Sequence, residues 1–306
     1  MDFLRISDVG IAGLRTILDA TARIKASPSD VEGLLSGTSI GVFFEKPSTR
    51  TRVSCEVAAV HLGAHPVMLR GDEVGLGKRE ALKDVARVLD RYVDALAFRV
   101  FRHEHLEELA KHARGPVINL LSDVGHPCQI VADLATIEEH MALQGCRITY
   151  VGDGNNVCNS LLLGGAMSGM HVTVCTPPGY EPDAEEVVAA RAIAATTGGS
   201  ITLMSDAVAG MRDAHVLYTD VWTSMGQEAE AEQRLRDFEG FQIDLAALSS
   251  ADANALFLHC LPAHRGEEVT DDVMEHPRSM VFDQAENRMH AFSAVLLYAS
   301  GSLPTW

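Results

Sequence analysis

Short apolar runs alternate with longer amphipathic segments along nearly the whole chain. The runs predict buried strands, and they cover Ile40–Phe44, Pro66–Leu69, Ala95–Phe98, Val117–Leu120, Ile148–Val151, Val172–Cys175, Val216–Thr219, Leu256–Cys260 and Met280–Phe282. The segments between them have helical spacing, as in Glu80–Tyr92, Glu104–Ala113, Gln129–Met141, Asp183–Thr196 and Glu286–Ala299. Such alternation predicts an α/β fold in which helices cover both faces of parallel sheets.

The length of 306 residues accommodates two such units of roughly 150 residues each. The pattern contains no fixed-period repeat and no low-complexity segment. We place the boundary on the helix predicted at Gln129–Met141, which Gln144-Gly145 would end before the first strand of the second unit. The predicted fold is two doubly wound parallel-sheet domains joined by helices.

Charge and cysteine usage restrict the class of protein. A formal net charge of −17 argues against nucleic acid or an anionic membrane as a partner, because both repel an acidic surface. The six cysteines are scattered among apolar neighbours without a C-x-x-C pair, which is typical of reduced thiols in the cytosol. The first ten residues lack the basic start and apolar core of a signal peptide, and no uncharged apolar stretch reaches spanning length. We therefore expect a cytoplasmic protein that binds an anionic substrate in a local basic pocket.

The strongest candidate site follows the first predicted strand, where the sequence reads Ser48-Thr49-Arg50-Thr51-Arg52 and a helix begins. Helix N-termini have unpaired N–H groups and partial positive charge, which suit a bound anion. Hydroxyl and guanidinium groups in the same turn would add charge-assisted hydrogen bonds. The cluster predicts a phosphate site, although a serine cap with arginines facing water explains this segment alone equally well.

Further candidates follow other strands of the first half. His126 precedes a helix that Pro127 starts and that carries Gln129 in its first turn. The positive helix end would favour a neutral imidazole, which can donate to a carbonyl oxygen. Arg99 ends the third predicted strand and could polarise a substrate oxygen, as could Arg288 at the start of the last predicted helix. Each has a plainer interpretation, a solvated loop histidine or a surface arginine, which we would prefer if it stood alone.

Polar residues also follow strands in the second half. Gly152–Val157 resembles the dinucleotide fingerprint G-x-G-x-x-G, but Val157 replaces the third glycine, and Cys175-Thr176 ends the next strand without an acidic ribose partner. NAD binding is thus disfavoured, and the asparagines suit an amino-acid-like ligand. Asp220 could pair with an ammonium group, and Gly226 would let the loop after it close over substrate; an ordinary strand-to-helix connection is the plain alternative.

Two other chemistries are disfavoured. Neighbouring strand residues point to opposite faces, so His259 cannot easily act as a base for a Cys260 nucleophile. His103 and His105 lie two apart at a predicted helix start, and no other ligand is spaced to join them. We therefore predict neither a metal nor a cofactor.

Taken together, the motifs resemble those of the ornithine carbamoyltransferases, within the aspartate/ornithine carbamoyltransferase family, over essentially the whole chain. They are Phe44-Glu45-Lys46-Pro47-Ser48-Thr49-Arg50-Thr51-Arg52, His126-Pro127-Cys128-Gln129, Asp220-Val221-Trp222-Thr223-Ser224-Met225-Gly226, His259-Cys260-Leu261-Pro262 and Glu286-Asn287-Arg288. The first two are shared by carbamoyltransferases generally. The Ser-Met-Gly loop and the His-Cys-Leu-Pro turn discriminate better, because relatives specific for aspartate, putrescine or acetylornithine lack that loop.

The resemblance implies an architecture and a reaction. A carbamoyl phosphate-binding domain would cover residues 1–135, with the final helix, residues 285–306, packing back on it, and an ornithine-binding domain would cover 136–284. The reaction would transfer the carbamoyl group from carbamoyl phosphate to the δ-amine of L-ornithine, giving L-citrulline and phosphate in arginine biosynthesis. It would need no metal or cofactor. The resemblance also implies a homotrimer with active sites at the subunit interfaces.

The resemblance further implies a role for each candidate residue. The phosphate would be held by Ser48, Thr49, Arg50 and Thr51. The carbonyl oxygen would be polarised by Arg99, His126 and Thr51, and the carbamoyl group supported by Gln129 and Arg288. Ornithine would be bound by Asn156, Asp220, Ser224 and Met225, with Asp220 and Ser224 at its α-ammonium end. Cys260 and Leu261 would lie beside the reacting amine. The catalytic set would thus be Arg99, His126, Cys260 and Arg288.

One loop departs from the family pattern. Family members usually carry Gln or His before a Leu-Gly pair in the loop that reaches a neighbouring subunit's carbamoyl phosphate, whereas Gly75 precedes Leu76-Gly77 here. Because glycine offers only backbone groups, we expect this contact to be lost unless Lys78 or Arg79 replaces it. Three alternative functions stay open: a carbamoyltransferase for another amine or amino acid, a non-catalytic ligand-binding paralogue, and an NAD oxidoreductase.

Overall fold

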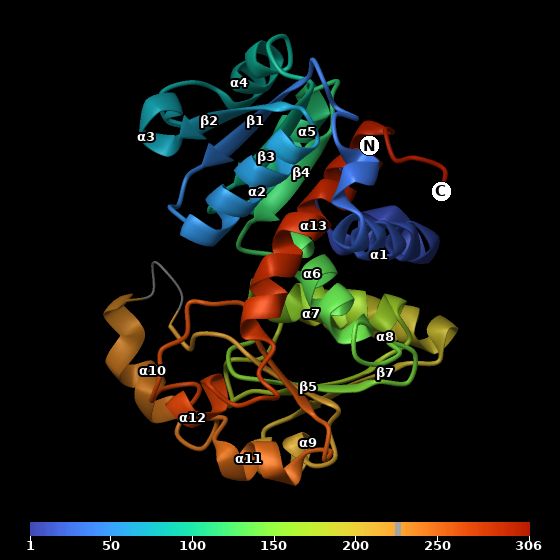
Figure 1. Ribbon diagram of the computed structural model, residues 1–306. Coiled ribbons are helices and arrows are strands. Elements are labelled where there is room, and N and C mark those ends of the chain that lie inside the picture. Colours follow the sequence, from blue (N-terminus) through green and yellow to red (C-terminus); the bar gives the residue numbers. More distant parts are fainter. Residues whose placement is uncertain (224–227) are drawn as a thin grey trace. The chain divides into compact units, whose positions relative to one another are not determined.

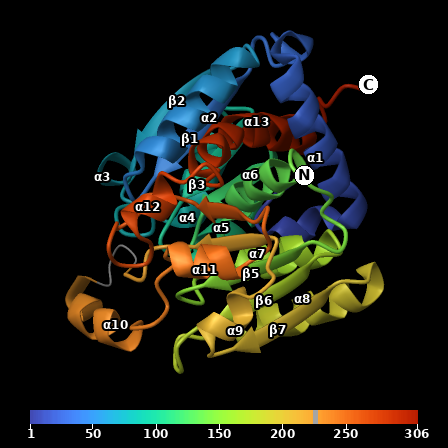
Figure 2. The same cartoon turned by 60° about the horizontal axis from the view of Figure 1, so that its bottom comes forward.

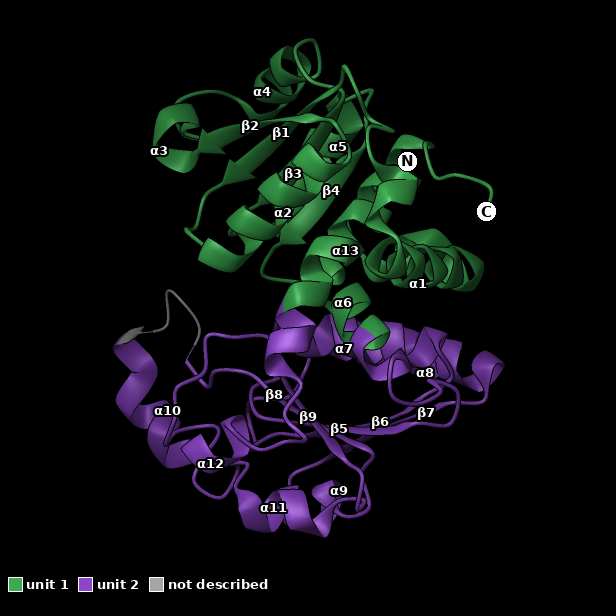
Figure 3. Cartoon of the chain, viewed as in Figure 1, with its two compact units in different colours: residues 1–135, 286–306 green, residues 136–285 purple. Residues whose placement is uncertain are grey.

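The computed structural model describes residues 1–223 and 228–306, which form two α/β units (Figure 1). The first unit comprises Met1–Ala135 and Glu286–Trp306, and the second comprises Thr136–Ala285 (Figure 3). The chain passes into the second unit within α6 (Pro127–Glu138) and returns within α13 (Val281–Ser300). The named strands form one parallel sheet in each unit, so the predicted α/β fold with two doubly wound parallel sheets is confirmed.

The first unit is built on a sheet with the strand order β2-β1-β3-β4. Its strands are β1 (Ser39–Phe44), β2 (His65–Arg70), β3 (Ala95–Arg99) and β4 (Val117–Leu121). Its helices are α1 (Gly10–Ala26), α2 (Thr49–His61), α3 (Gly71–Val74), α4 (Leu82–Leu89) and α5 (His103–His112), with short 3-10 helices η1 (Ile6–Val9) and η2 (Pro28–Val31). Phe43 and Phe98 from the strands pack with Val85 of α4 and Leu106 of α5 in one apolar core. Burial of this face fixes α4 and α5 against the sheet.

The end of α13 packs within the first unit. The Met1 ammonium group donates to the carbonyl oxygen of Ala299 at 2.7 Å. A Cβ on Gly13 of α1 would lie 2.5 Å from the Tyr298 hydroxyl, so these two helices approach closely where a side chain is missing. This packing anchors the helix that carries Arg288.

The second unit is built on a sheet with the strand order β7-β6-β5-β8-β9. Its strands are β5 (Arg147–Val151), β6 (His171–Cys175), β7 (Ser200–Met204), β8 (Val216–Thr219) and β9 (Leu256–His259). Its helices are α7 (Asn156–Met167), α8 (Ala184–Thr197), α9 (Ala207–Met211), α10 (Ala231–Asp237), α11 (Leu245–Ser250) and α12 (Asp271–Met274), with the 3-10 helix η3 (Glu228–Glu230). Helices α7 and α8 cover one face of the sheet and α9 and α11 the other (Figure 1), and α8 runs along the edge strand β7 (Figure 2).

Two predicted elements differ from the structure, and one strand is absent from the prediction. Met280–Phe282 is not a strand, because α13 begins at Val281, which is buried while Phe282 is 62% exposed. The edge strand β7 is absent from the predicted set; its exposed Ser200 and Thr202 alternate with Ile201 and Leu203. Helix α6 begins at Pro127, as predicted, but ends at Glu138, well before Gln144-Gly145. A short apolar run such as Met280–Phe282 fits the spacing of a strand and that of a helix, so only its burial in the folded chain distinguishes the two structures.

Candidate active site

Helix α2 begins where the sequence predicts, directly after β1. Ser48 is its N-cap residue, and its Oγ accepts a hydrogen bond from the Thr51 backbone N–H at 3.3 Å. Thr49, Arg50 and Thr51 therefore lie in the first turn, where helix N–H groups have no partner within the helix. Thr51 is buried, Arg50 is half-buried and Thr49 is exposed. The segment thus combines a helix N-terminus with one exposed, one half-buried and one buried side chain.

Arg288 joins this helix start from the far end of the sequence. It lies in the second turn of α13, not at the start that the sequence suggested. Its Nη2 donates to Thr51 Oγ1 at 2.7 Å, and its Nη1 donates to Gln129 Oε1. The Nε of Arg288 is buried and has no hydrogen-bond partner within the described ranges. A buried guanidinium donor is thereby held in place with one N–H still to satisfy.

In the first unit, a small pocket is lined by Thr51 of the helix start, Arg288 and His126. Its lining consists of Thr51, Ser54, Cys55, Leu120, His126, Cys128, Arg288 and Phe292. His126 lies between β4 and α6 and is 4% exposed, and Arg99 ends β3 and is also buried. Since β1, β3 and β4 are neighbours in a parallel sheet, the residues that follow them gather at one edge.

The electrostatics of the pocket favour a neutral imidazole. Burial lowers the pKa of His126 well below its usual value of 6.5, and the Arg288 and Arg99 guanidinium groups lower it further. At neutral pH the site therefore holds two permanent cations beside a histidine that can donate one N–H. The neighbouring Cys55 thiol is not a nucleophile at this pH, because burial raises its pKa to about 12.

In the second unit, Asp220 is the centre of a buried hydrogen-bond cluster. It follows β8, and its Oδ2 accepts from Asn155 Nδ2 at 2.8 Å. Its Oδ1 accepts from the Cys260 thiol at 3.0 Å and from the Val221 backbone N–H at 2.8 Å. Asn155, Asp220 and Cys260 follow β5, β8 and β9, which are adjacent strands. The fold thus presents an oriented carboxylate with a thiol beside it, an arrangement suited to an ammonium ligand.

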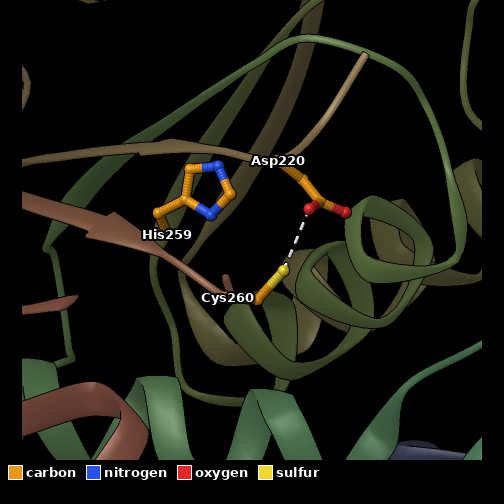
Figure 4. Close-up of side chains that lie close together, drawn as sticks. All are labelled: Asp220, His259 and Cys260. Atoms are coloured by element: carbon orange, nitrogen blue, oxygen red, sulfur yellow. Dashed lines mark hydrogen bonds between the residues drawn. The ribbon is translucent and has the colours of Figure 1, made fainter. Parts of the chain in front are cut away.

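The ring of His259 lies close to Asp220 and Cys260 (Figure 4), and one ligand atom from each of these residues lies within 4.8 Å of the others. Both ring nitrogens are already engaged. Nδ1 accepts from the Leu261 backbone N–H at 2.9 Å, and Nε2 is 3.1 Å from Glu268 Oε1. Neither ring nitrogen therefore has a lone pair directed at a metal ion or at the thiol proton. The sequence argument expected the His259 and Cys260 side chains to point apart, whereas they lie close together.

The glycine-rich turn after β5 has a structural explanation. A Cβ on Gly154 would lie 2.3 Å from the Pro182 nitrogen, so the glycine allows the backbone of a second segment to approach. Asn155 caps α7, and its Oδ1 accepts from the Val157 and Cys158 backbone N–H groups. These are N–H groups that a dinucleotide pyrophosphate would need. The turn therefore does not support the NAD alternative.

The remaining predicted ornithine-site residues lie near this cluster or outside the described residues. Asn156 is the first residue of α7 and Leu261 follows Cys260, and both are half-buried. Ser224 and Met225 fall outside the described residues. Sequence reasoning missed Arg234, which links two segments of this unit: its Nη1 donates to Asp153 Oδ2 and to the Trp222 carbonyl oxygen, each at 2.9 Å.

Gly75 occupies a turn that requires glycine. It ends α3 with φ +62°, and a Cβ would lie 2.7 Å from the Cβ of Arg79. Arg79 is itself engaged, since its Nη1 donates to the Glu73 carbonyl oxygen at 3.2 Å. The glycine at this position is therefore explained by the turn that this chain makes here.

Comparison with known families matches nearly the whole chain. The family model described as "Aspartate/ornithine carbamoyltransferase, carbamoyl-P binding domain" matches residues 1–139. The model described as "Aspartate/ornithine carbamoyltransferase, Asp/Orn binding domain" matches residues 144–299. No helix within the described ranges has the length and apolarity that crossing a bilayer requires.

Individual relatives agree with the family match. An ornithine carbamoyltransferase from Pyrococcus horikoshii is 48% identical over 99% of this chain and 97% of its own length. A protein from Pyrococcus furiosus named "Ornithine carbamoyltransferase, anabolic" is 48% identical over the same two shares. A solved structure of ornithine carbamoyltransferase from Pyrococcus furiosus superposes with a TM-score of 0.96 at 48% identity, covering 99% of this chain and 98% of that chain.

Proposed function

The chain belongs to the aspartate/ornithine carbamoyltransferase family, and from this premise we propose that it is an enzyme that transfers the carbamoyl group of carbamoyl phosphate to the δ-amine of L-ornithine. The products are L-citrulline and phosphate. The proposal is carried by the buried Thr51–Arg288 contact beside His126, within the part of the chain that matches a carbamoyl phosphate-binding domain. The name of the Pyrococcus furiosus relative supports a biosynthetic direction, toward arginine.

The first unit binds carbamoyl phosphate. Ser48, Thr49, Arg50 and Thr51 hold the phosphate, because a helix N-terminus with hydroxyl and guanidinium donors matches its oxygens. Arg99, His126 and Thr51 polarise the carbonyl oxygen. The neutral His126 donates an N–H without adding a third buried positive charge. Gln129 and Arg288 support the carbamoyl group.

The second unit binds ornithine. Asp220 and Ser224 meet the α-ammonium end of the substrate, and Asn156 and Met225 complete its binding. Cys260 and Leu261 lie beside the reacting amine. The contacts of Asp220 with Asn155 and Cys260 support this assignment, because they leave the carboxylate in one orientation.

The reaction is a displacement at the carbonyl carbon. The neutral δ-amine attacks, a C–N bond forms, and negative charge develops on the carbonyl oxygen. The C–O bond to phosphate then breaks, and the departing phosphate takes the proton that the attacking nitrogen loses. Preorganised donors aimed at both sites of developing charge lower the barrier, and losing one typically costs ~10²–10³ in rate. The remaining contribution comes from holding the two substrates in line.

We further propose a cytoplasmic homotrimer with active sites at the subunit interfaces. The resemblance to the family supports this assembly. Gly75 limits what this loop can contribute to the active site of a neighbouring subunit, because a side chain at its turn would be strained. Sedimentation or light scattering would test the assembly directly, and a monomer with full activity would contradict it.

The decisive experiment incubates the purified protein with carbamoyl phosphate and a panel of amines, and identifies the carbamoylated product. The expected result is citrulline from ornithine, with little product from putrescine, acetylornithine or aspartate. Formation of another product would support the alternative acceptor, and no product from neutral to alkaline pH would support a non-catalytic paralogue. Arg50→Ala should lose carbamoyl phosphate affinity without unfolding, since a half-exposed arginine on a phosphate contributes little to the core.

A further inference from the structure

Asp133 is a fully buried carboxylate that the reaction scheme above does not use. It lies on α6 one turn after Gln129, and both side chains are at most 1% exposed. Gln129 Nε2 donates to Asp133 Oδ1 at 2.7 Å, while Gln129 Oε1 accepts from Arg288 Nη1. The carboxylate, the amide and the guanidinium group therefore form a continuous buried chain that ends on Thr51.

The hydrogen-bonding capacity of the two ends determines the orientation of the amide. A carboxylate only accepts and a guanidinium group only donates, whereas an amide has one face of each kind. With Nε2 toward Asp133 and Oε1 toward Arg288, both contacts are satisfied. The flipped amide would set N–H against guanidinium N–H and C=O against carboxylate. Because the site is buried, water cannot relieve these contacts.

This orientation bears on the acyl group of the substrate. A carbamoyl group carries an amino group where an acetyl group of nearly the same size carries a methyl group. An oxygen presented beside Arg288 can accept an N–H from the carbamoyl group, and it gains nothing from a methyl group. An amide nitrogen at the same position would oppose the carbamoyl amino group, donor against donor.

We propose that Asp133 is a positioning residue that holds the Gln129 amide oxygen toward the acyl group, and that this makes the site select carbamoyl phosphate over acetyl phosphate. The inference rests on the proposed function of the first unit as the carbamoyl phosphate site. Asp133 does not touch the substrate and acts through Gln129. Removing the carboxylate therefore lowers selectivity between the two acyl phosphates more than it lowers affinity for the phosphate they share.

The test measures the dissociation constants of carbamoyl phosphate and of acetyl phosphate by calorimetry, without ornithine, on the full-length protein. Asp133→Leu should reduce the ratio of the two affinities about tenfold or more, as expected for a hydrogen bond involving a charged group. Asp133→Asn keeps an acceptor oxygen and should retain part of the ratio. Leu134→Ala, a buried change on the same helix, should lower the melting temperature and leave the ratio unchanged.

A second comparison separates positioning from general damage and remains informative if Asp133→Leu does not fold. Gln129→Met removes the amide and should lose the selectivity, and adding Asp133→Asn to it should change the ratio no further. Equal weakening of both ligands in the Asp133 variants, or a further loss in the double variant, would overturn the proposal. If the unaltered protein bound neither acyl phosphate, the proposed function would fall with it. If it bound both but made no citrulline, only the acceptor assignment would fail.

Discussion

Replacing Thr51 with valine would remove one hydroxyl from the buried pocket of the first unit while changing its volume little. The Thr51 side chain is 2% exposed, and its Oγ1 accepts from Arg288 Nη2 at 2.7 Å and from Ser48 Oγ at 3.1 Å. Valine accepts neither hydrogen bond. Because Arg288 is only 8% exposed, water has little access to the N–H that loses its acceptor.

The magnitude follows from these two contacts. The hydrogen bond from a charged guanidinium group is worth ~1.5–3 kcal/mol. The contact from Ser48 adds little, since that half-buried hydroxyl can turn to solvent. We therefore expect the free energy of unfolding to fall by ~1.5–3 kcal/mol. If the same contact orients Arg288 in the transition state, kcat/KM for carbamoyl phosphate falls by about tenfold or more, at ~1.4 kcal/mol per factor of ten.

Urea unfolding at one protein concentration, together with citrulline formation at saturating ornithine, measures both effects. Thr16→Val is the matched control, because Thr16 is an exposed helical threonine in the same unit whose hydroxyl donates to the Ala12 carbonyl oxygen. Its effect should stay within ~0.5 kcal/mol, as for most surface substitutions. If Thr51→Val destabilised no more than this control and kept its activity, Arg288 would not depend on the hydroxyl and the account of the pocket would be wrong.

Asp220→Asn should weaken ornithine binding far more than carbamoyl phosphate binding, because the amide has no charge for an ammonium group and cannot accept all three present hydrogen bonds; equal losses in calorimetric titrations of the two ligands would contradict this. Gly75→Gln should lower the free energy of unfolding by ~1–2 kcal/mol, owing to the left-handed φ and the close Cβ of Arg79, and urea denaturation without a shift would refute the assignment. Burial lowers the pKa of His126 from 6.5, so below pH 6.5 the unfolded chain binds a proton that the folded protein does not. Stability should therefore fall with decreasing pH in that range, by up to ~1.4 kcal/mol per pH unit for this one histidine, and be independent of His126 above it. His126→Gln should flatten that slope, whereas identical slopes in thermal unfolding of the two proteins would refute the buried neutral state.

Local pattern was sufficient for much of the fold. The alternation of apolar runs with amphipathic segments predicted parallel sheets, because most of these segments are long enough to show helical or strand spacing of their apolar residues. The pattern failed at Met280–Phe282, where three apolar residues fit a helix as well as a strand, and at β7, an edge strand in which polar residues interrupt the apolar run. The serine cap at Ser48, one of the two interpretations of that segment, could be read from the sequence because its hydrogen bond spans only three residues.

The candidate site, like the fold, was in part predictable from the sequence and in part decided by the tertiary structure. The sequence alone determined the family and the chemical types at the strand ends, because motifs are contiguous and carry their own spacing. Only the tertiary structure decided which of these residues form hydrogen bonds with one another. Asn155 contacts Asp220, 65 positions away, and Arg288 reaches Thr51 across 237. The lowered pKa of His126 likewise depends on the tertiary structure. Other segments of the chain bury the imidazole and bring the Arg288 and Arg99 guanidinium groups near it. A hydrogen bond between distant residues leaves no spacing to read, because it depends on where packing brings the chain.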